Sequence, residues 1–304
     1  MVIYYFNSCI VRVLIGIKMA TKFNAIELFL AVSLATTAGT QALAANVTDE
    51  NLEISDDSNS LVSELLVAQG GEGGEGGEGG EGGEGGEGGE GGTSSGNVDV
   101  DYLTSLGLMK GHLIVAQELI AEGNYEEAEP HIGHPVEELY SDIEAELPAR
   151  NVADFKPTLV EMQDLFKSAP ESPETKQAIS DSLAAIDGAV AALPAEKSQS
   201  PELVMDVIVE LLKNAAAEYE AAIANNQFVE VEEYQDSRGF VLYAEELYQN
   251  ISEQKNKQDS EDHQIILESF AELKSAWPSV NPPETPVKST SEVYSLVSQI
   301  ELRK

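Results

Sequence analysis

Three of the four histidines in the chain lie close together, at His112, His131 and His134. Two glutamates follow shortly after His134, and a methionine lies one helical turn before His112. Imidazole, carboxylate and thioether groups are the side chains with which proteins bind transition metals. We therefore predict a metal site, with these candidate ligands: His112, His131, His134, Glu137, Glu138 and Met109.

The choice of metal follows from the side chains present. The only cysteine, Cys9, lies in a segment that we expect to be removed, so thiolate ligands are excluded. Neutral imidazole with carboxylate suits iron, copper or zinc, and a Met109 ligand would favour copper. We expect a transition metal ion, with iron favoured. A structural polar cluster and a pH-sensing histidine group are the alternatives.

A helical hairpin would bring these side chains together. Apolar residues recur at helical spacing on both sides of a break at Gly123-Asn124. With the turn centred there, His112 lies at the level of His134 and Glu138. A shared metal requires the ring nitrogens of His112 and His134 to lie within about 8 Å, given ligand distances of about 2.1 Å. Pro130, Gly133 and Pro135 should break or kink the second helix.

The rest of the chain after Asp99 is also predicted to be helical, and no stretch shows the alternation of a β-strand. Helices are expected at about 125–147, 157–167, 174–193, 202–225, 228–255, 260–276 and 290–302. We predict an all-α fold.

The helical part also resembles itself at an offset of 103 residues, which pairs Leu139-Tyr140 with Leu242-Tyr243. We predict two related antiparallel helical-bundle repeats, 98–194 with the metal site and 195–304 without it. Chance similarity between helices rich in Ala and Glu is the alternative. Met109, His112 and Glu138 correspond to apolar residues in the second repeat, so we expect them to face inward.

The N-terminal part carries signals of export. Residues 1–44 are predicted to be a signal region with cleavage after Ala44, and residues 1–18 an over-extended start before Met19. Residues 45–97, with a Gly-Gly-Glu repeat, are predicted to be a disordered acidic linker. We expect a secreted, periplasmic protein whose mature chain has no membrane span, because the apolar runs are too short.

The formal charge of −37 excludes nucleic acid as a plausible partner and favours cations or basic protein surfaces. The segment Gly133-His134-Pro135-Val136-Glu137 resembles the His-x-x-Glu signature of imelysin-type proteins. This resemblance implies an exported helical protein linked to iron uptake, with His134 and Glu137 as ligands. A separate group of exported helical proteins that accompany iron permeases fits equally well and would imply a membrane metal permease as partner.

Residue patterns typical of catalysis are not evident. The sequence offers no Ser/His/Asp or Cys/His arrangement and no phosphate-binding loop between strand and helix. We predict a non-catalytic, exported protein that binds a metal for uptake or storage. The enzymatic alternative is a di-metal carboxylate oxidase in a bundle core. The alternative of another class is a structural or adaptor protein that binds partners through acidic helical faces.

Overall fold

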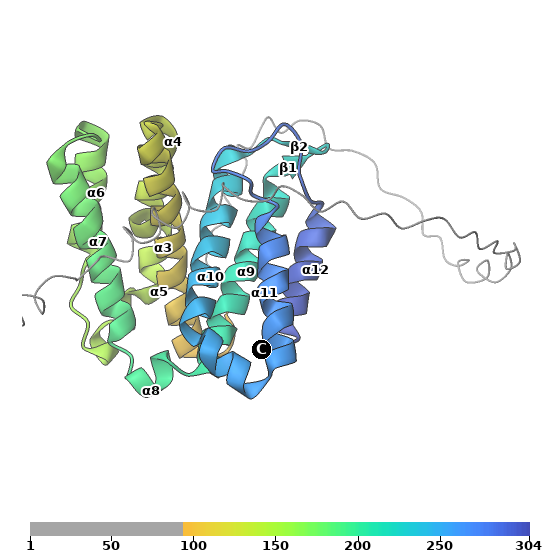
Figure 1. Ribbon diagram of the computed structural model, residues 1–304. Helices are drawn as coiled ribbons and strands as arrows, with labels where there is room; N and C mark the ends of the chain where they lie inside the picture. Colours follow the sequence, from red (N-terminus) through yellow and green to blue (C-terminus); the bar gives the residue numbers. More distant parts are fainter. Residues whose placement is uncertain (1–93) are drawn as a thin grey trace, which may run out of the picture. The chain divides into compact units, whose positions relative to one another are not determined.

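The computed structural model describes residues 94–304, and their regular secondary structure is almost entirely helical (Figure 1). The predicted signal region and nearly all of the predicted linker lie outside the described residues. The first half contains α3 (Val98–Glu122), α4 (Tyr125–His134), the π-helix η1 (Pro135–Leu139), α5 (Tyr140–Glu144), the 3-10 helix η2 (Pro148–Arg150), α6 (Lys156–Ser168), α7 (Pro173–Ala191) and α8 (Ala195–Ser198). The second half contains α9 (Pro201–Ala221), β1 (Ile223–Ala224), β2 (Gln227–Phe228), α10 (Val231–Gln258), α11 (Ser260–Lys274) and α12 (Thr290–Glu301).

The all-α prediction is confirmed, and most helices end within a few residues of their predicted limits. The hairpin turn is at the predicted place. Gly123 ends α3 there with φ 79°, a left-handed conformation that glycine adopts at little cost at the C-terminal ends of helices. The prediction missed the short β1–β2 ladder between α9 and α10. Its turn residues Asn225 and Asn226 have φ of 53° and 61°, values that asparagine tolerates in tight hairpins.

The helices pack as two four-membered rings. In the first bundle α3 contacts α4, α4 contacts α6, α6 contacts α7, and α7 returns to α3. In the second bundle α9, α10, α11 and α12 contact one another in the same cyclic order. This is the architecture of two helical bundles that the sequence predicted. A common origin of the two bundles in a repeated sequence stays a prediction.

The two bundles share one core, because α10 packs extensively against α3 as well as against α9. At their crossing the backbones of α3 and α10 touch: a Cβ atom on Gly239 would lie 2.3 Å from the carbonyl oxygen of Gly111. Only glycine permits so close an approach of two helices. The crossing fixes how α10 is positioned along the axis of α3, and therefore which residues of the two helices face each other.

The predicted helix over 125–147 is interrupted. Pro130 lies inside α4, and Pro135 begins the five-residue π-helix η1 directly after His134. A π-helical turn is wider than an α-helical one, so it rotates the following side chains away from the positions that α-helical spacing predicts. Proline also removes a backbone donor, which explains why the irregular turn starts there.

The described part of the chain contains no candidate for a membrane-spanning helix. No helix between residues 94 and 304 has both the length and the apolar character that a span requires.

Candidate metal centre

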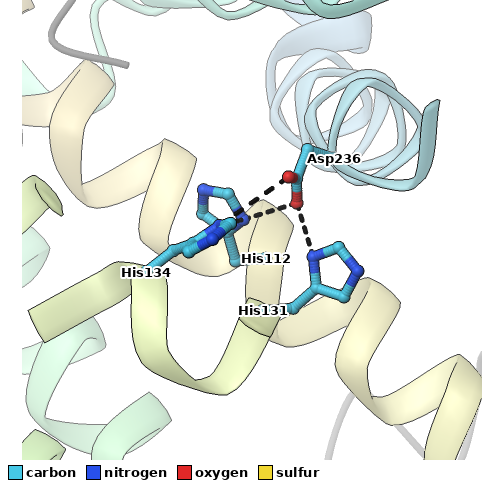
Figure 2. A group of neighbouring side chains, drawn as sticks. All are labelled: His112, His131, His134 and Asp236. Atoms are coloured by element: carbon cyan, nitrogen blue, oxygen red, sulfur yellow. Dashed lines mark hydrogen bonds and ion pairs between the residues drawn. The ribbon is translucent and has the colours of Figure 1, made fainter. Parts of the chain in front are cut away.

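Four side chains converge between α3, α4 and α10 (Figure 2). His112 and His131 each direct Nδ1 at Oδ1 of Asp236, at 2.6 and 2.7 Å. The third imidazole, of His134, has its Nδ1 3.3 Å from Nδ1 of His112 and 3.7 Å from Oδ2 of Asp236. The predicted convergence of His112 and His134 is therefore present, well within 8 Å. We call these four residues the histidine–aspartate cluster.

Each helix contributes for a local reason. His112 directly follows Gly111, and Asp236 lies one turn before Gly239, so the close crossing of α3 and α10 brings the two side chains together. His131 and His134 are one turn apart on α4, which places both on one helix face. α4 then ends at Pro135.

The cluster is largely buried, and only one of its four side chains is partly exposed. His112, His131 and Asp236 are fully buried, whereas the side chain of His134 is 13% exposed. Burial raises the pKa of the Asp236 carboxyl, but the adjacent His112 and His131 rings outweigh it and hold that pKa well below its ordinary value. The carboxyl is thus ionised, since hydrogen bonds to the charged form of a carboxyl favour that form.

One atom of the cluster is not satisfied by the protein. Oδ2 of Asp236 is buried and has no hydrogen-bond partner among the described residues. A buried polar atom without a partner costs on the order of 1–3 kcal/mol, so such atoms commonly mark a missing water or ion. The unsatisfied oxygen faces Nδ1 of His134 inside the cluster.

The other predicted ligands lie outside the cluster or at its edge. Glu138 is 4.0 Å from Nε2 of His134 and is partly exposed. Glu137, 56% exposed, turns to α6, where it accepts a hydrogen bond from Gln163 and lies 3.8 Å from Lys167. Both glutamates lie in η1: Glu138 is the i,i+4 neighbour of His134, whereas Glu137 is directed to α6. Met109 is fully buried in the hydrophobic core, and a ligand role for its sulfur stays a prediction.

The sequence interpretation missed Asp236, because all of its candidate ligands lie in the first repeat. Three consecutive polar residues of α10, Gln235, Asp236 and Ser237, are buried. A signal was present: Asp236 lies within a helix between Tyr234 and Phe240, both core residues. A carboxylate on a core-facing helix surface requires a partner.

The cluster has the dimensions of a metal site. Each residue offers one ligand atom, and these atoms lie within 4.8 Å of one another. Four ligand atoms arranged tetrahedrally at about 2.1 Å from one metal are about 3.4 Å apart, so the most widely separated pair would have to approach by about 1.4 Å. Three imidazole nitrogens and one carboxylate oxygen suit iron, zinc or copper.

Comparison with known proteins gives one family match. Residues 194–303 match the model of the iron permease-associated 4-helix bundle domain. No curated protein and no solved structure gives a match. The matched stretch contains α9 to α12 and therefore Asp236, but not the three histidines of the cluster. The match supports a helical protein linked to iron uptake.

Proposed function

We propose that this protein is an exported, non-catalytic carrier or store that binds one transition metal ion, iron in preference, in the histidine–aspartate cluster. The observation that carries the proposal is the convergence of three imidazoles on a buried carboxylate whose second oxygen has no hydrogen-bond partner among the described residues. A cation in this space would satisfy that oxygen and separate the facing nitrogens of His112 and His134.

Iron is favoured by the match of the second bundle to an iron permease-associated domain. The donor set alone does not select iron over zinc or copper, since all three accept imidazole and carboxylate. We propose a membrane metal permease as the partner, and export to the periplasm as the setting in which the two would meet. Of the two motif residues that resemble imelysin-type proteins, only His134 supports this proposal. The other, Glu137, points away from the cluster.

Calorimetric titration of the full chain without a polyhistidine tag tests the proposal. Fe(II), Zn(II) and Cu(II) are each titrated into the wild type and into a His112→Ala/His134→Ala variant. We expect one ion per chain in the wild type. Affinity in the double variant should fall by more than the roughly 10–100-fold that outer-shell changes cause, because two ligands are lost.

The fourth histidine supplies the matched control. His263 lies on α11, where its Nδ1 contacts the hydroxyl of Tyr248 at 2.8 Å. His263→Ala removes one imidazole and leaves the cluster intact, so its affinity should equal that of the wild type. Equal binding by the wild type and the double variant would overturn the proposal.

A structural polar cluster is the second candidate, and one observation favours it. The contacts of 2.6 and 2.7 Å between Asp236 and two imidazoles are those of a buried ion pair network that needs no metal. Such a network would join the two bundles of a structural or adaptor protein with acidic helical faces. It predicts no metal binding and no change in thermal stability on adding metal, whereas a specific ligand of the folded state raises stability.

A further inference from the structure

We propose that α10 sets the tautomer of both α4 histidines, so that His131 and His134 bind the metal through Nδ1. The residues responsible are Gln235 and Glu232, which touch the far nitrogens of the two rings. They are positioning residues for the ion and not ligands. This inference rests on the proposed metal-binding function.

The first half of the argument is a hydrogen-bond chain that runs from Glu127 to His131. The Gln235 side chain is held between them, with Nε2 2.8 Å from Glu127 Oε2 and Oε1 2.8 Å from His131 Nε2. A carboxylate only accepts hydrogen bonds, so the end of Gln235 that faces Glu127 must be its NH2 group. Oε1 of Gln235 therefore faces His131, and His131 must donate from Nε2–H.

This series of hydrogen bonds leaves Nδ1 of His131 as the nitrogen that faces the cluster. With the proton on Nε2, a neutral ring carries its lone pair on Nδ1, which lies 2.7 Å from Oδ1 of Asp236. Two acceptors so close together require a shared cation, which is a proton in the metal-free protein or the metal ion in the loaded one.

His134 has the same arrangement at the mouth of the cluster. Its Nε2 lies 2.9 Å from Oε1 of Glu232, while Nδ1 points inward to His112 and Asp236. This ion pair with the Glu232 carboxylate favours a proton on Nε2 and so leaves the lone pair on Nδ1. Glu232 is 45% exposed, so this contact lies at the surface.

One helix face supplies all three groups. Glu232, Gln235 and Asp236 are spaced i, i+3 and i+4 on α10, so they project from the same side. Outer-shell partners that fix ring orientation typically change metal affinity by about 10–100-fold when removed. α10 would thus hold the anionic ligand and also aim two neutral ligands that another helix carries.

The test uses the full, untagged chain with imidazole 15N labels and Zn(II), a diamagnetic probe. In two-dimensional 15N–1H NMR spectra of the Zn(II)-loaded wild type, His131 and His134 should carry their proton on Nε2 and the metal on Nδ1. Gln235→Leu and Glu232→Leu should each weaken Zn(II) binding by about 10–100-fold.

Two variants separate orientation from general damage to the fold. Glu232→Gln keeps an acceptor oxygen for His134, and Glu127→Gln/Gln235→Glu reverses the partners but keeps the acceptor at His131. Both should bind Zn(II) within about threefold of the wild type, whereas loss of affinity in both would indicate a merely structural role and overturn the inference.

The outcomes also distinguish this inference from the proposed function. A wild type that binds no Zn(II), Fe(II) or Cu(II) overturns the metal site itself, and the inference with it. A wild type that binds Zn(II) through Nε2 of either histidine, or as tightly after Gln235→Leu and Glu232→Leu, overturns only the inference.

Discussion

The two helices that build the cluster differ in regularity. α10 is continuous over 28 residues, whereas the corresponding part of the first bundle is broken into α4, the π-helix η1 and α5. The broken segment carries two of the imidazoles, and the continuous helix carries the carboxylate and the groups that contact those imidazoles. The irregular element thus supplies two imidazoles, and the regular element supplies the groups that contact them.

The difference between the bundles also limits what the family match explains. The match to the iron permease-associated domain covers the second bundle. That bundle contributes Asp236 to the cluster but none of its three histidines. The candidate centre exists only where both bundles meet. Variants that act on this junction should therefore have the largest effects, and variants elsewhere in either bundle the smallest.

Asp236→Asn should have the largest effect. It removes the charge that His112 and His131 face, and breaking a buried pair typically costs about 3–5 kcal/mol. Metal affinity should fall together with the free energy of unfolding, as measured by calorimetry and urea denaturation. Asp206→Asn on α9, which removes a partly exposed ion pair with Lys304, is the control and should cost at most about 1 kcal/mol. Equal losses in the two variants would contradict the account.

Gly239→Ala should have the next largest effect, since its methyl group would collide with the backbone of Gly111. Overpacking of this kind costs about 1–3 kcal/mol, and separating α3 from α10 should also weaken metal binding. Gly188→Ala on α7 is the matched control, because no atom lies within 4 Å of the added Cβ. It should stabilise the helix by about 0.5–1 kcal/mol. Thermal unfolding of both variants measures the contrast.

Arg238→Ala should have a smaller effect, again at the junction. The guanidinium donates to both oxygens of Glu118 on α3, at 2.7 and 2.9 Å, and to the carbonyl of Trp277 at 2.8 Å. Loss of a charged hydrogen bond costs about 1.5–3 kcal/mol, and partial exposure of Glu118 places this one toward the lower end. Arg238→Lys should recover only part of the stability, because an ammonium cannot match the two oxygens at once.

Lys197→Ala should have the smallest effect, because it lies away from the junction. Lys197 is 61% exposed and donates a hydrogen bond of 2.6 Å to Asp99. This bond and the nearby Arg150 lower the pKa of the Asp99 carboxyl, although burial acts to raise it. A lowered pKa contributes stability above the unfolded value of about 3.9 and loses it as pH falls through the folded value. The variant should thus lose up to about 1 kcal/mol at pH 7 and less than that at pH 2. Urea denaturation at both pH values measures this, and a larger loss at pH 2 would contradict the sign.

The sequence was sufficient for the helices and for three of the four side chains in the histidine–aspartate cluster. Apolar periodicity and the Gly123-Asn124 break predicted the hairpin, and the hairpin predicted that His112 and His134 would meet. Spacing could not predict the contact between bundles, because that contact depends on two glycines, Gly111 and Gly239, at which the helix backbones touch. For the same reason Asp236 was missed. Glu137 lies in a π-helical turn, which has no simple sequence signature, and its side chain is directed to Gln163.

Anomalous diffraction from a crystal of the iron-loaded full chain, recorded on both sides of the iron absorption edge, tests the central claim most directly. The account predicts one strong peak at about 2.0–2.2 Å from Nδ1 of His131 and His134 and from a carboxylate oxygen of Asp236, with His112 as the fourth side chain. A peak elsewhere on the chain, or no peak in protein that retains iron, would contradict it.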